Sequence, residues 1–197
     1  YVFVSALLVT CPPRTAAPQA PPERAATRVA EEVTVTILSS NLASGATIGE
    51  WGLSALVMVD GRCVLFDAGR HPDTVLRNAA ALDVDLSCVT DVVLSHFHFD
   101  HTTGLLPIVR AVRGKNPEAI QRVHVAEGFF LPRRSLTADR DTEWNQMIAM
   151  REAFTETGVE FIEHDASTEI VPGVWVTGPI NRPHSERNYP STVQIRL

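Results

Sequence analysis

The sequence predicts an α/β fold in which strands come first and helices are interspersed among them. Segment 33–38 alternates β-branched residues in the manner of a strand. Segment 73–82 places apolar residues at helical spacing, with Asp73 as its predicted cap. The chain has 197 residues, which is long enough for one domain with a hydrophobic core. Hydrophobic residues make up 45% of it and charged residues 20%, which is an ordinary globular composition.

The remaining elements follow the same two patterns along the chain. Further strands are expected at 53–59, 63–66, 91–94, 121–126, 159–162, 169–171, 174–177 and 192–197. The Asp60-Gly61 pair is the predicted hairpin turn between the strands at 53–59 and 63–66. Further helices are expected at 102–113 and 141–157, the second ended by Gly158. There is no internal repeat, so we assign residues 33–197 to one domain.

The first 32 residues differ from the rest of the chain. Residues 1–10 are mostly apolar but too few to cross a bilayer as a helix, so they are interpreted as the remnant of a signal peptide. The sequence ending at Cys11 resembles a bacterial lipobox, and residues 11–32 form a Pro/Ala-rich linker. We therefore expect a secreted or periplasmic protein, with a lipid anchor at Cys11 as its only membrane contact. The alternative is a frayed strand with an incidental cysteine. The chain starts without a basic segment and stops inside a predicted strand, so we expect both ends to be clipped.

The net charge and the two remaining cysteines limit the kinds of partner and site that the sequence supports. The net charge is −6 and no run of Lys or Arg is present, so we expect a small-molecule substrate and no nucleic acid partner. Cys63 and Cys88 are predicted to be small buried apolar residues without metal-ligand spacing. A disulfide between them stays open at this point, as does the oligomeric state.

The candidate metal ligands lie in one short segment. Ser95 is followed by His96, His98, Asp100 and His101, which places three imidazoles and a carboxylate directly after a buried strand. Imidazole nitrogens and carboxylate oxygens suit Zn²⁺, and also Fe or Mn²⁺. Alternate residues of an extended turn project the same way, so His96 and His98 can share one ion. Asp100 and His101 can then hold a second ion.

This His-x-His-x-Asp-His pattern after an apolar strand resembles the signature of the metallo-β-lactamase superfamily. Segment 65–69 is similar to the Asp-x-Gly element of that family, where Asp67 would brace the ligand loop; as a residue alone, Asp67 could equally be a turn or cap residue. Segments 50–54, 178–180 and 186–189 resemble the branch related to dihydropterin methyl-ribofuranosylaminobenzene-phosphate synthase. The resemblance implies an αββα sandwich, of which this chain holds the N-terminal part.

The resemblance also implies a function. It predicts a hydrolase with two ions, zinc by default, whose metal-bound hydroxide cleaves an ester, amide or phosphoester bond, with Asp100 as the catalytic residue that orients the water. Two alternatives stay open: an iron-dependent redox enzyme on the same fold, and a truncated, non-catalytic relative. The family's later metal ligands are missing from this chain, so weak metal binding is expected.

Several other side chains are candidates for a role in the site. Glu50 and Trp51 lie in a loop expected to reach over the metals, so they are candidate substrate contacts, although Trp51 could simply cover the core edge. His184 is a weaker substrate candidate. Four further groups are expected to be structural or solvated: His71 in a loop, His124 packed in the sheet, His164 at the surface, and the pair Arg133–Arg134 in solvent. Trp144, Met147, Ile148 and Met150 are expected in the core.

Overall fold

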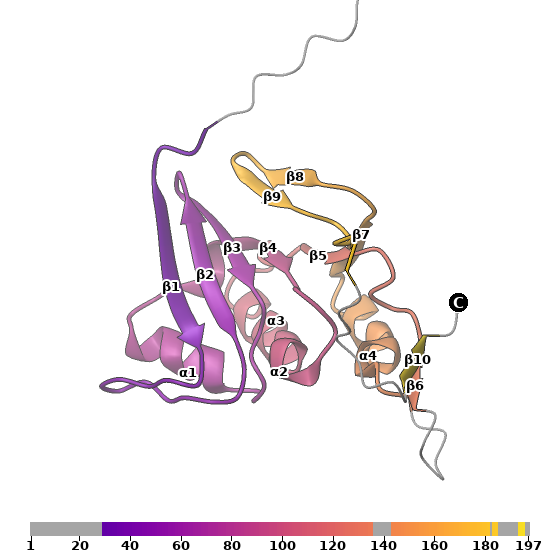
Figure 1. Cartoon of the computed structure of the whole chain (residues 1–197). Helices are drawn as coiled ribbons and strands as arrows, with labels where there is room; N and C mark the ends of the chain where they lie inside the picture. The colour runs from indigo at the N-terminus through magenta and orange to yellow at the C-terminus, as the bar shows by residue number, and fades with distance from the viewer. Residues whose placement is uncertain (1–28, 136–142, 182, 185–192, 196–197) are drawn as a thin grey trace, which may run out of the picture.

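The computed structural model describes residues 29–135, 143–181, 183–184 and 193–195. The predicted signal remnant, Cys11 and most of the linker lie outside these residues. A six-stranded sheet with the order β1-β2-β3-β4-β5-β7 forms the centre of the fold (Figure 1). Its strands are β1 (Val33–Ser39), β2 (Ser54–Val59), β3 (Arg62–Phe66), β4 (Val89–Val93), β5 (Arg122–Ala126) and β7 (Glu160–His164).

The sheet changes from antiparallel to parallel at β3. Strands β1, β2 and β3 pair antiparallel, and the β2–β3 hairpin turns at Asp60 and Gly61, as predicted, with both residues at positive φ. Strands β3, β4, β5 and β7 pair parallel. Their carboxyl ends therefore meet at one edge, which is where open α/β sheets usually carry their functional loops.

Helices cover one face of the sheet. They are α1 (Thr74–Ala81), α2 (Phe99–Thr102), α3 (Leu105–Arg113) and α4 (Gln146–Thr155), with the 3₁₀ turn η1 (Leu86–Cys88) leading into β4. Leu65, Val92 and Val123 of the sheet join Ile108 of α3 and Phe154 of α4 in one core, each fully or almost fully buried. Among the described residues, no helix is both long and apolar enough to cross a membrane.

The opposite face of the sheet meets a small hairpin, β8 (Thr168–Val171) with β9 (Val174–Val176) (Figure 1). A cavity of about 460 Å³ lies between this hairpin and the sheet, lined by Val64 and His124 on the sheet side and by Trp175 on the hairpin side. A second short ladder joins β6 (Arg133–Ser135) to β10 (Val193–Ile195).

The helix predicted over 102–113 is interrupted at Gly104. A Cβ at Gly104 would lie 2.0 Å from the carbonyl oxygen of Ala68, so the chain passes backbone against backbone there. The Gly104 N–H also donates to the carbonyl of Gly69 at 3.3 Å. This contact lies between α2 and α3 and holds the loop after β3 against the loop after β4.

The long predicted helix is shorter at its start. Helix α4 begins at Gln146, with Asn145 capping the N–H of Met147 at 3.2 Å, and its predicted beginning falls partly in residues outside the description. Met147 is buried as expected, but Trp144 precedes the helix and is 44% exposed, so its assignment to the core was wrong.

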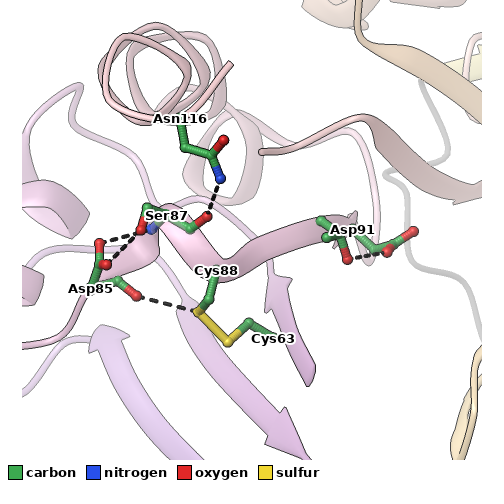
Figure 2. Close-up of a disulfide and its surroundings, with 7 residues drawn as sticks. Cys63, Asp85, Ser87, Cys88, Asp91 and Asn116 are labelled. Atoms are coloured by element: carbon green, nitrogen blue, oxygen red, sulfur yellow. Dashed lines mark hydrogen bonds between the residues drawn. A yellow bond between two sulfur atoms is a disulfide. The ribbon is translucent and has the colours of Figure 1, made fainter. Parts of the chain in front are cut away.

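Cys63 and Cys88 form a disulfide, which corrects their prediction as two separate buried apolar residues. Their Cα atoms are 5.7 Å apart, and only Cys63 is buried. The bond ties β3 to the turn η1, where Asp85 accepts from the Ser87 N–H at 2.9 Å and Asn116 donates to the Ser87 carbonyl (Figure 2). The disulfide therefore fastens the entry to the strand that carries the histidine motif.

Candidate metal centre

The histidine motif lies at the carboxyl edge of the parallel strands. Strand β4 ends at Val93, and the Leu94 N–H donates to the His124 carbonyl of β5 at 3.0 Å, which keeps the chain in the sheet up to the motif. The backbone then turns away, and α2 starts at Phe99 with His98 as its cap residue. A rigid strand on one side and a helical turn on the other thus hold the motif.

The structure brings all four predicted ligand side chains into one cluster. The ring centroid of His96 lies 4.5 Å from that of His98 and 4.2 Å from that of His101. Asp100 completes the cluster, since its Oδ2 is 3.5 Å from Nε2 of His101. Side chains separated by up to five positions in the sequence therefore face a common region.

Asp67 anchors this cluster from below. Its side chain is fully buried, and its backbone has a positive φ of 53°. Oδ1 accepts from the Ser95 N–H at 2.7 Å, while Oδ2 accepts from the Ser95 hydroxyl at 2.8 Å and lies 2.7 Å from Nδ1 of His101. The carboxylate thus fixes both the start of the loop and the ring of His101, whose Nε2 points away from Asp67.

The electrostatics differ among the three histidines. Burial, together with the neighbouring rings of His101 and His98, lowers the pKa of His96 to about 4. Burial also lowers the pKa of His98. Burial acts in the same direction on His101, but the hydrogen bond and the negative charge of Asp67 outweigh it and raise the pKa of His101. His96 and His98 are therefore neutral at neutral pH, which is the form of imidazole that binds a metal.

This donor set fits a divalent transition metal in its chemistry. Two neutral imidazoles, a third imidazole held by a carboxylate, and Asp100 are the ligand types that zinc prefers, and the His101–Asp67 contact is the outer arrangement typical of metal-binding histidines. Within the described part of the chain, no three His, Cys, Asp or Glu side chains already converge tightly enough to enclose an ion. The residues that would hold the metal are therefore gathered, but they do not form a closed shell.

Glu50 has a structural task in the neighbouring loop. It is only 8% exposed, and its carboxylate accepts from the Ser39 hydroxyl at 2.6 Å and from the N–H groups of Arg70 and His71 at 2.9 and 2.8 Å. Each carboxylate oxygen thus already accepts a hydrogen bond from the protein, and the predicted substrate contact of Glu50 stays a prediction. Trp51, in contrast, is 65% exposed, and so does not cover the core edge.

His71 and His184 are both exposed, and within the residues that the structure describes neither side chain makes a hydrogen bond or ring contact with the motif. The predicted substrate role of His184 stays a prediction.

A second group of titratable residues, not foreseen as a group, lies along β4, β5 and β7. His164 was predicted at the surface, but it is buried at 9% exposure, with its Nε2 2.9 Å from Nδ1 of His124. Nε2 of His124 lies 2.8 Å from Oδ1 of Asp91, which also accepts from Nε of Arg122 at 2.7 Å. The register that pairs these strands places the four residues together, so spacing along the chain alone could not reveal the group.

Arg133 is also buried, at 7% exposure, which corrects its prediction as a solvated residue. Its guanidinium carbon lies 5.1 Å from the ring centroid of Phe97, the residue between His96 and His98 in the sequence.

Comparison with known proteins identifies the family. The profile of the Metallo-beta-lactamase superfamily matches residues 49–171. The 7,8-dihydropterin-6-methyl-4-(beta-D-ribofuranosyl)-aminobenzene-5'-phosphate synthase of Methanocaldococcus jannaschii is 33% identical over 70 residues, which are 34% of this chain and 24% of that protein. Endoribonuclease ysh-1 of Neurospora crassa is 38% identical over 69 residues, 33% of this chain and 8% of that protein.

Among solved structures, Tm1679, described as a metal-dependent hydrolase of the beta-lactamase superfamily, superposes with a TM-score of 0.55 at 24% identity. The match covers 84% of this chain and 55% of that chain, and it shows that the fold is shared. The chain spans about a quarter of the synthase and about half of Tm1679. Since the superfamily profile covers more than half of the sequence, including the complete histidine motif, the chain belongs to the metallo-beta-lactamase superfamily.

Proposed function

We propose that this chain is part of a metal-dependent hydrolase whose centre is the cluster of His96, His98, Asp100 and His101. One observation carries the proposal: three half-buried imidazoles and a carboxylate meet at the carboxyl edge of the parallel strands, with centroids 4.2 to 4.5 Å apart. The superfamily match supports a metallohydrolase in general terms. The type of bond cleaved and the class of substrate, given below, are part of the proposal.

The chain's own residues would divide the work. His96 and His98 would hold one ion through nitrogens that are neutral at neutral pH, and Asp100 and His101 would hold a second. Asp67 orients His101 through its Nδ1, so the ring keeps one fixed direction. The carboxylate of Asp100, 3.5 Å from Nε2 of His101, would accept a proton from the attacking water and orient it. When bound, a divalent metal would supply Lewis acidity and lower the pKa of water.

Zinc is the proposed metal, and the same ligands accept iron or manganese. The proposed targets are ester, amide or phosphoester bonds of small molecules, because the chain carries a net charge of −6 and no basic run that would favour nucleic acid. An iron-dependent redox reaction would be indicated instead by iron in the natively purified protein.

The proposed location is the periplasm or the cell exterior, with Cys11 as a site for a lipid anchor. The disulfide between Cys63 and Cys88 supports this proposal, because structural disulfides persist mainly in oxidising compartments. The apolar start and the Pro/Ala-rich segment behind it point the same way.

The test is hydrolysis by the full chain after zinc loading. 4-Nitrophenyl acetate and bis(4-nitrophenyl) phosphate would report ester and phosphoester cleavage, with the chelated protein as the blank. We expect turnover that depends on zinc and falls by about 100-fold or more in Asp100→Asn, because that variant loses the proton-accepting carboxylate. Exposed Asp73→Asn, in the pair with Arg77, is the matched control and should keep full activity. Turnover that survives Asp100→Asn would contradict the assigned role, and its absence from the zinc-loaded wild type would favour the non-catalytic alternative.

A further inference from the structure

Three exposed side chains belong to three segments whose backbones meet at the motif. Trp51 is 65% exposed in the loop before β2, Phe99 is 44% exposed inside the motif, and Arg70 is exposed in the loop after β3. Large aromatic side chains are usually buried, so two of them in the open beside a candidate centre call for an explanation. We refer to Trp51, Arg70 and Phe99 as the aromatic rim.

The backbones of these segments meet at Asp100. The Leu53 N–H donates to the Asp100 carbonyl at 3.3 Å. A Cβ on Gly52 would lie 2.8 Å from that carbonyl oxygen and 3.0 Å from the backbone nitrogen of Arg70. Only glycine therefore lets these three segments of the backbone come this close. Trp51 directly precedes Gly52, so its backbone lies beside the motif.

The position of Arg70 is fixed by Glu50. The buried carboxylate accepts from the N–H groups of both Arg70 and His71. Burial alone would raise the pKa of Glu50, but the hydrogen bonds from Ser39, Arg70 and His71 outweigh it and lower the pKa. The Glu50 carboxylate therefore stays ionised at neutral pH. The loop that carries Arg70 is therefore set before any ligand arrives.

The side chain of Arg70 lies against Phe99, with the guanidinium carbon 4.8 Å from the ring centroid. In the described part of the chain, no carboxylate lies within ion-pair distance of this guanidinium, whereas Arg77 pairs with Asp73 and Arg122 with Asp91. A guanidinium that stacks on a ring keeps its N–H groups for a carboxylate or phosphate. The rim thus combines aromatic faces with one uncompensated positive charge.

We infer that the aromatic rim binds the substrate of the neighbouring centre, and that this substrate carries a planar aromatic group with an anionic substituent. Trp51 would stack on the aromatic group, and Arg70, aligned by Phe99, would pair with the anion. The inference rests on the proposed function only in assigning the bound molecule as a substrate, since the rim itself needs no metal to bind a ligand.

The experiment is calorimetric titration of the full chain, kept free of metal by a chelator, with 1-naphthyl phosphate. Propyl phosphate and 1-naphthol serve as probes that keep only the anion or only the ring. We expect 1-naphthyl phosphate to bind more tightly than either, and Trp51→Ala and Arg70→Gln each to weaken it by roughly threefold to tenfold. Both side chains are exposed, so the variants should keep the unfolding midpoint of the wild type.

Two matched controls come from elsewhere in the chain. Trp175 is a similarly exposed indole, at 50%, beside the cavity under β9, and Arg151 stacks on Phe130 at 4.5 Å. Trp175→Ala and Arg151→Gln should leave binding unchanged. Weakening by Trp175→Ala would place the probe in the cavity and overturn the inference, as would equal binding of all three probes or unchanged binding in Trp51→Ala.

This assay contains neither metal nor turnover, so its outcome is separate from that of the hydrolysis test. If the chain hydrolyses esters but the substitutions in the rim do not change binding of the probe, only the inference is refuted. A chain that binds the probe through the rim and shows no hydrolysis would refute the proposed function alone.

Discussion

Reducing the disulfide between Cys63 and Cys88 should destabilise the chain by a predictable amount. The two cysteines are 25 positions apart, and in the chain-entropy description a cross-link closing a loop of that length contributes about 3.5 kcal/mol to the free energy of unfolding. This contribution arises in the unfolded state, because the bond restricts the chain between β3 and η1.

The assay is urea unfolding followed by circular dichroism, with and without a thiol reductant. The free energy of unfolding should fall by about 3.5 kcal/mol on reduction, and the double variant Cys63→Ala/Cys88→Ala should resemble the reduced protein and be insensitive to the reductant. Thiol titration of the unfolded, unreduced protein, produced without lipidation, should detect one of the three cysteines, namely Cys11. Three free thiols, or equal stability before and after reduction, would refute the reasoning.

Three further predictions follow from single contacts. Gly104→Ala should lower the free energy of unfolding by about 1–3 kcal/mol, because its Cβ would meet the Ala68 carbonyl at 2.0 Å, whereas Gly114→Ala at an ordinary φ of −63° should change it much less; similar losses in a urea titration would contradict this. Burial, and then the charge of His124, lower the pKa of His164, so the unfolded state binds more protons below pH 6.5 and stability should fall as the pH drops from there; a pH series of urea melts in which His164→Gln keeps the full slope would count against it. Asp67→Asn should weaken zinc binding by roughly 10- to 100-fold in a chelator-competition titration, since it replaces the charged carboxylate beside Nδ1 of His101 by a neutral amide, and an unchanged affinity would show that this charge does not matter.

Local patterns predicted most of the sheet and the motif. The alternation at 33–38 and the Asp60-Gly61 turn are short-range signals, and the corresponding strands β1, β2 and β3 form as expected. The motif was equally visible, because its four ligand types stand within six positions of one another. The family match confirms the resemblance on which the fold prediction depended.

Several of the features that were missed depend on contacts between distant segments. Gly104, where the predicted helix is interrupted, lies against the Ala68 carbonyl, which is 36 positions away in the sequence but adjacent in space. His164 appeared to be a surface residue because its partner His124 lies 40 positions away on the next strand. Sequence spacing carries no signal for such pairs until the strand register is known.

The central claim is that the histidine motif binds a divalent metal, and zinc titration of the chelator-treated full chain tests it most directly. We expect weak zinc binding that is reduced in His96→Ala/His98→Ala, which lacks both ligands assigned to the first ion, and unchanged in the control His71→Ala, whose ring is exposed and outside the cluster. Equal zinc binding by the wild type and the double variant, or no zinc binding by the wild type, would contradict the account.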